Sequence, residues 1–141
     1  MSKKSNQLAD LIFTINKLTK EGMEYGLNSL TFTQLQTLSF VYRSTNPNIK
    51  EISKYLHITP PSVTSMVNNL VKLKLLKRKT SGCDKRSKNI LLTTKGEKEL
   101  HKGYALAKKC LEKRLDYLSE KDKKEFIRII SKLSHIFEQK D

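Results

Sequence analysis

Short, uncharged polar side chains fill one segment of the sequence. Residues 60–71 contain no Asp, Glu, Lys or Arg, although charged residues make up 30% of the chain. On a helix, where each residue turns by about 100°, the apolar members of the segment fall within one narrow arc: Val63, Met66, Val67 and Leu70. We therefore predict a helix that buries this arc and presents hydrogen-bonding groups on its other side.

The opposite arc has the chemistry needed to read a nucleic acid. Asn side chains can pair bidentately with adenine, and Ser or Thr hydroxyls can reach base edges or phosphates. A face without carboxylates also suits contact with phosphates, whereas an ordinary solvated helix face usually carries Glu and Lys pairs. We predict contact with double-stranded DNA by the residues of this arc: Pro61, Ser62, Thr64, Ser65, Asn68, Asn69 and Lys72.

A strongly basic segment follows this helix. Residues 72–88 contain eight Lys or Arg and one acidic residue. Two of the five arginines lie here, and an arginine on a slim loop can enter the minor groove, where negative potential is concentrated. A solvated basic loop is the alternative, but the place directly after the helix favours DNA contact. We expect such contacts from Arg78, Lys85, Arg86 and Lys88.

The charge of the whole chain agrees with a polyanionic partner. Lys and Arg total 28 against 14 Asp and Glu, a formal net charge of +14. Nucleic acid is the commonest soluble polyanion, although a membrane surface or an acidic protein also attracts such a chain. The apolar runs are too short to span a bilayer. Asp10 and Asn16 interrupt the continuous apolar stretch that a secretory signal needs. Because the cysteines number only two, we expect a reducing, cytoplasmic location.

Helix caps and apolar spacing predict the elements that position these residues. Side chains suited to cap a helix start stand at Thr31, Asn48, Thr59 and Ser119. We predict helices over about residues 5–25, from Thr31 to the turn at Pro47, from Asn48 to about His57, and over about 60–73. Two short strands flank the polar stretch at 80–88, a long helix opens at Thr93 or Thr94, and a last helix follows Ser119. The predicted fold is mainly α with a small β-hairpin.

The segment after the basic loop resembles a known family. Asp84, Arg86, a short spacer, then Leu92-Thr93 and Gly96 are similar to the wing signature of the MarR family of bacterial transcription regulators. Residues 58–64 are similar to the start of the family's recognition helix. The resemblance implies that Arg86 is the residue that enters the minor groove and that Asp84 orients the wing.

The resemblance also implies an architecture for the whole chain. Residues 1–141 are expected to form a single MarR-like domain, with a winged helix-turn-helix lobe at 31–93. Helices at 5–25 and 95–138 are expected to build an obligate homodimer, and their apolar stripes are too extensive for the lobe to cover. A crevice for a small apolar or aromatic effector is implied beside Ile15, Leu18, Leu38, Tyr42 and Tyr104, although core packing explains the same residues.

The sequence departs from the family pattern at two places. Lys74 stands where the family usually has Gly at the end of the recognition helix. A left-handed Lys costs about 1 kcal/mol more than Gly, so we expect this turn to be shaped differently. Asn68 and Asn69 stand where an acidic residue and then a basic one are frequent, so the bases that are read are expected to differ.

The expected function is that of a DNA-binding transcription regulator, a dimeric repressor released by a small ligand. His57, His101 and His135 lie far apart in the sequence, and no catalytic or phosphate-loop motif is present, so we expect no enzyme activity, metal or cofactor. One alternative is a redox regulator through Cys83, whose basic neighbours would lower its thiol pKa. Another is a helical protein-interaction module with a vestigial wing.

Overall fold

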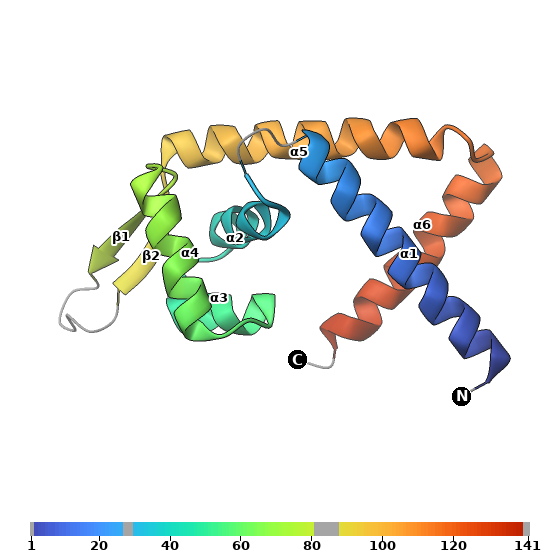
Figure 1. Cartoon of the computed structure of the whole chain (residues 1–141), viewed down its shortest axis with the longest axis horizontal. Coiled ribbons are helices and arrows are strands. Elements are labelled where there is room, and N and C mark those ends of the chain that lie inside the picture. The colour runs from blue at the N-terminus through green and yellow to red at the C-terminus, as the bar shows by residue number, and fades with distance from the viewer. Residues whose placement is uncertain (1, 27–29, 81–87, 140–141) are drawn as a thin grey trace. The chain divides into compact units, whose positions relative to one another are not determined.

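The computed structural model of the chain describes residues 2–26, 30–80 and 88–139 (Figure 1). Helices α1 (Lys3–Gly26), α2 (Phe32–Arg43), α3 (Ile49–Leu56) and α4 (Pro60–Lys72) come first. Strands β1 (Leu76–Thr80) and β2 (Lys88–Leu92) follow, and then helices α5 (Thr94–Leu115) and α6 (Glu120–Glu138). The mainly α fold with one small hairpin, predicted from the sequence, is confirmed.

The chain divides into two compact units, residues 1–107 and 108–141. The first contains α1 to α4, the hairpin and most of α5, and the second contains the end of α5 and α6. No helix in the described ranges is long and apolar enough to cross a membrane. The residues predicted to form the tip of the wing, which are Cys83, Asp84, Lys85 and Arg86, lie outside the described residues.

The predicted caps set the helix starts, with one correction. Thr31 and Gln34 form the reciprocal capping box at α2, and the Asn48 side chain accepts a hydrogen bond from the Glu51 amide at 2.9 Å. Thr59 is the N-cap residue of α4, but its side chain caps no backbone amide. Pro61, at the second helical position, has no N–H to donate, and the Thr59 hydroxyl pairs with the Ser62 hydroxyl at 2.9 Å instead.

One core joins α2, α3, α4, the start of α5 and the hairpin. Its fully buried side chains come from α2, α3, α4, β1, β2 and α5: Leu38, Ile52, Val63, Val67, Leu70, Leu76, Ile90 and Leu100. The strands are antiparallel, with Arg78 opposite Ile90. The Ile90 amide also donates to the Pro47 carbonyl at 2.8 Å. The hairpin is therefore fixed to the turn that precedes α3.

The turn between α4 and β1 corrects the expectation for Lys74. Its φ of 60° is left-handed, so the turn keeps the conformation that favours Gly. Lys74 N–H donates to the Val71 carbonyl and Leu75 N–H to the Leu70 carbonyl, both at 2.9 Å, which is the Schellman pattern of a helix end. Leu70 and Leu75 are both buried in the core. These bonds and this burial offset the cost of a left-handed Lys.

The start of α5 is tied to the same turn. The Thr93 hydroxyl donates to the carbonyls of Lys74 and Leu75 at 2.7 and 3.0 Å, and Lys95 Nζ donates to the Leu73 carbonyl at 3.0 Å. A Cβ added to Gly96 would lie 2.1 Å from the Leu75 carbonyl oxygen. Close approach of α5 to this turn therefore requires Gly at position 96.

Candidate nucleic-acid interface

Helix α4 separates a buried side from an exposed side as predicted. Val63, Val67 and Leu70 are 0% exposed, and Met66 packs against the same core. Every residue of the predicted contact arc is exposed: Pro61, Ser62, Thr64, Ser65, Asn68, Asn69 and Lys72. The helix therefore offers a continuous face of hydroxyl and amide groups without a carboxylate.

The connection from α3 to α4 fixes the angle at which this face is presented. His57 ends α3 with a left-handed φ of 54°, a position that the sequence pattern did not reveal. The Ser53 hydroxyl is buried and donates to the Ile58 carbonyl at 2.5 Å, and the Ile58 amide donates back to the Ser53 carbonyl at 3.3 Å. These bonds pair backbone groups of the turn and set the direction of α4.

A side chain from the hairpin meets the exposed face of α4. The Arg78 guanidinium on β1 donates a hydrogen bond to Asn68 Oδ1 on α4. Arg78 is half-buried, whereas Lys77 and Lys79 on either side of it are exposed. Sequence reasoning named Asn68 and Arg78 as separate DNA contacts and missed this bond, because no local pattern marks a contact between a helix and the following strand.

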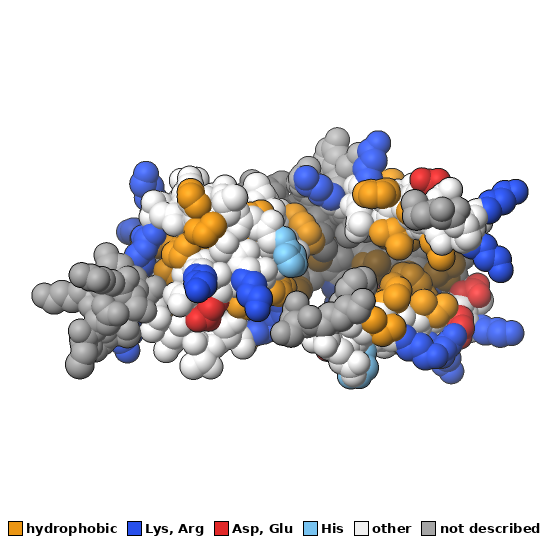
Figure 2. All heavy atoms as spheres, turned by 90° about the horizontal axis from the view of Figure 1, so that it is seen from below, with side chains coloured by type: hydrophobic (Ala, Val, Ile, Leu, Met, Phe, Trp, Pro, Cys, Tyr) orange, Lys and Arg blue, Asp and Glu red, His pale blue; other side chains and the backbone are white. Residues whose placement is uncertain are grey.

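The remaining predicted contacts are placed only in part. Lys88 opens β2, paired with Thr80, and its side chain is not described. Lys85, Arg86 and the wing-orienting Asp84 remain predictions. On the face drawn in Figure 2, Lys and Arg side chains (blue) are more numerous than Asp and Glu (red), in agreement with the net charge of +14.

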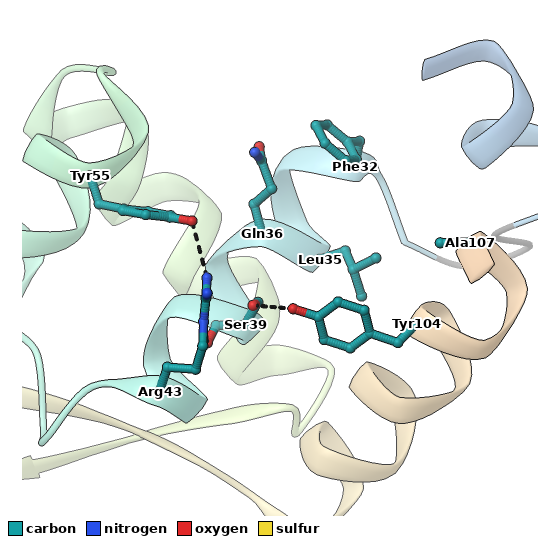
Figure 3. A pocket seen from close by; sticks show the side chains of 8 residues that line it. All are labelled: Phe32, Leu35, Gln36, Ser39, Arg43, Tyr55, Tyr104 and Ala107. Atoms are coloured by element: carbon teal, nitrogen blue, oxygen red, sulfur yellow. Dashed lines mark hydrogen bonds between the residues drawn. The ribbon is translucent and has the colours of Figure 1, made fainter. Parts of the chain in front are cut away.

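A pocket of about 170 Å³ lies between α2, α3 and α5 (Figure 3). Tyr104 bonds to the Ser39 hydroxyl at 2.5 Å, and Arg43 Nη2 donates to the Tyr55 hydroxyl at 3.2 Å. The Tyr55 ring stacks on Phe40, with ring centroids 4.4 Å apart. The pocket thus combines apolar walls with a cation and hydroxyls. Its lining is Phe32, Leu35, Gln36, Ser39, Arg43, Tyr55, Tyr104 and Ala107.

The predicted crevice residues do not gather around this pocket. Only Tyr104 lines it, whereas Leu38 is fully buried in the core. Tyr42 is 50% exposed and meets the His101 ring edge-on at 5.7 Å. Ile15 and Leu18 are exposed on α1. Sequence reasoning missed Ser39 and Arg43, which lie four residues apart on α2 and therefore on the same face of that helix.

Metal chemistry finds no support in the part of the chain that the structure describes. There, no group of three or more His, Cys, Asp or Glu side chains could hold a metal ion. The geometry instead offers three features: the exposed face of α4, the contact of Arg78 with that face, and a separate small pocket.

Comparison with known proteins decides what this arrangement is. A model of the MarR family matches residues 28–87, a range that includes α2, α3, α4 and β1. The chain carries a MarR-family domain. The resemblance inferred from the residues of the wing is thereby confirmed, and α4 takes the place of the second helix of the helix-turn-helix in this domain. A comparison with curated protein sequences gave no match.

Solved structures of MarR-family proteins share the fold. The apo form of E. coli MarR is similar with a TM-score of 0.81 at 20% identity, covering 89% of this chain and 96% of that chain. S. aureus MepR in complex with DNA is similar with a TM-score of 0.73 at 26% identity, covering 90% and 96%. YusO from Bacillus subtilis is similar with a TM-score of 0.70 at 22% identity, covering 95% and 99%.

Proposed function

We propose that this MarR-family chain is a sequence-specific double-stranded DNA-binding transcription regulator that acts as a dimeric repressor. The observation that carries the proposal is the exposed, carboxylate-free face of α4. Short hydroxyl and amide groups on such a face can reach base edges in the major groove while leaving phosphates unrepelled. The similar fold of MepR, whose structure is a DNA complex, supports the same docking mode.

The basic hairpin supports a second contact with the same duplex. Lys77 and Lys79 lie exposed on β1, and Lys85, Arg86 and Lys88 follow in the sequence. We expect Arg86 to enter the minor groove, since arginine is attracted to the negative potential concentrated there. Asp84 is expected to orient this loop.

The terminal helices support a homodimer. In α6, Phe126, Ile129, Ile130, Leu133 and Ile136 are all at least 40% exposed. In α1, a second set is exposed: Leu8, Leu11, Ile12, Phe13, Ile15 and Leu18. Apolar surface of this extent marks a protein interface, and a second copy of the chain would cover it and align two α4 helices on one duplex.

Selection from a pool of randomised DNA duplexes tests the proposal. Purified full-length protein is expected to enrich an inverted repeat with half-sites about one helical turn apart. The logarithm of its affinity is expected to fall linearly with the logarithm of the salt concentration. Absence of any enriched sequence would exclude specific DNA binding and leave the protein-interaction module as the better explanation.

The pocket of Figure 3 supports release of DNA by a small ligand. Phe32, Leu35 and Ala107 offer an apolar wall, and Arg43 with Tyr104 offers a cation and a hydroxyl. An aromatic ligand that carries one acidic group would satisfy both. Benzoate is therefore expected to release the DNA where the neutral benzyl alcohol does not, and Arg43→Met is expected to abolish the difference.

A redox switch through Cys83 is the competing regulation. Oxidation would place a polar or bulky group beside the basic residues of the wing. Peroxide that releases DNA from the wild type but not from Cys83→Ser would favour the thiol, whereas release by benzoate alone would favour the pocket.

A further inference from the structure

Asn68 and Arg78 form a pair at the edge of the exposed face of α4. The Arg78 guanidinium donates from Nη2 to Asn68 Oδ1. Arginine carries five N–H donors and no acceptor, so only the oxygen of the Asn amide can take this bond. The pair therefore orients the Asn68 amide, with its oxygen toward β1 and its NH2 group on the other side.

The pleat of β1 holds Arg78 in place for this contact. Alternate residues of a strand lie on opposite faces, so Arg78 shares its face with Leu76, which is 1% exposed. Its cross-strand neighbour Ile90 is fully buried. Lys77 and Lys79 lie on the other face and are exposed. Arg78 is therefore packed toward α4, whereas the neighbouring lysines extend into solvent.

We propose that Asn68 and Arg78 act as one unit that reads guanine in the major groove, an inference that rests on the proposed DNA-binding function. The groups that the unit presents, the Asn68 NH2 and the remaining N–H groups of Arg78, are all donors. Guanine offers two acceptors there, N7 and O6, and no donor. A donor-only unit therefore matches guanine.

Adenine is disfavoured by the same pair. An unengaged Asn matches adenine, because its oxygen accepts from N6 while its NH2 donates to N7. Here Asn68 Oδ1 already accepts from Arg78. The oxygen has a second lone pair, but the guanidinium charge beside it repels the positive amino hydrogens of adenine. Arg78 thus supplies donors of its own and also selects which base Asn68 reads.

Base preference measures this selection directly. The full-length wild type, Asn68→Ala and Arg78→Ala are each taken through selection from randomised duplexes, and the enriched half-sites are compared position by position. Arg78→Ala is expected to change one position from guanine to adenine by about fivefold or more, since its loss frees the Asn68 oxygen. Asn68→Ala is expected to weaken the guanine preference at the same position, because only the Arg78 donors remain there. Arg78→Lys, which keeps a charged donor, is expected to retain guanine.

Lys79→Ala is the matched control, because it removes the same charge from the opposite face of the same strand. It is expected to weaken binding to all sequences equally and to reduce the salt slope by about one. If Arg78→Ala also loses affinity equally for all sequences and keeps its base preference, the proposed reading of guanine by the pair is wrong. Failure of the wild type to enrich any sequence would instead overturn the proposed function. Thermal unfolding checks that each variant is folded. If Arg78→Ala lowers stability, Asn68→Ala, at an exposed position, still tests the base preference of the pair.

Discussion

At the scale of single residues, Lys74 shows how tertiary contacts override a local preference. A left-handed backbone costs an L-residue roughly 1–2 kcal/mol, and yet Lys74 adopts a φ of 60°. The hydrogen bonds of the helix end and the burial of Leu75 hold it there. The side chain of Lys74 is exposed, so the strain concerns the backbone alone.

Lys74→Gly is expected to raise the free energy of unfolding by about 1 kcal/mol, because Gly adopts positive φ without the steric cost. Urea denaturation followed by circular dichroism measures the change. Lys79→Ala, on the exposed face of β1, serves as a control and is expected to stay within about 0.5 kcal/mol. If Lys74→Gly is less stable than the wild type, the backbone at position 74 is not strained.

At the scale of elements, α5 and the helix-turn-helix are coupled through one small area. Thr93, Lys95 and Gly96 all meet the backbone between α4 and β1. Tyr104, further along α5, borders the pocket. A displacement of α5 by a ligand would therefore reach the end of α4 through these contacts, as ligand-controlled DNA binding requires.

Gly96→Ala is expected to destabilise the chain by about 1–3 kcal/mol, the usual range for overpacking. The new methyl group would lie 2.1 Å from the Leu75 carbonyl oxygen, which belongs to backbone and cannot rotate away. Lys98, on the same helix, is exposed and serves as the control. Thermal unfolding of Gly96→Ala and Lys98→Ala compares the two, and equal melting temperatures would refute the close approach.

The sequence predicted contacts between residues close together in the chain, but not contacts between residues far apart. Caps such as Thr31 with Gln34, and the apolar arc of α4, depend on residues three or four apart, and they were predicted. The Ser39–Tyr104 bond joins residues 65 apart in the sequence, and the Asn68–Arg78 bond crosses from helix to strand. No periodicity signals such contacts, so the pocket and the pair emerged only from the folded chain.

At the scale of the whole molecule, the apolar residues exposed on α1 and α6 favour association with a partner. Exposed apolar area of this kind destabilises an isolated chain in water, since burial is worth roughly 25 cal/mol per Å². A second copy of the chain exposes the same apolar residues, so the two copies can cover one another in a symmetric dimer. Such a dimer also provides the two α4 helices that an inverted repeat needs.

Ile130→Glu is expected to convert the dimer to a monomer, because a buried, unpaired carboxylate opposes association strongly. Light scattering should then give the mass of one chain, 16.3 kDa. Lys124→Glu, also exposed but on the opposite side of α6, is expected to leave the dimer intact. A wild type that is already monomeric at micromolar concentration would contradict the proposed assembly.

Contact between the exposed face of α4 and DNA can be tested by placing one carboxylate on that face. The affinity of Ser65→Asp for the duplex selected by the wild type is measured by fluorescence anisotropy. Ser131→Asp, the same exchange at an exposed position of α6, is the control. We expect the affinity of Ser65→Asp to fall by about 100-fold or more, since a carboxylate facing phosphates costs several kcal/mol, and that of Ser131→Asp to change little. Equal affinities of the two variants, with both folded, would contradict contact between α4 and DNA.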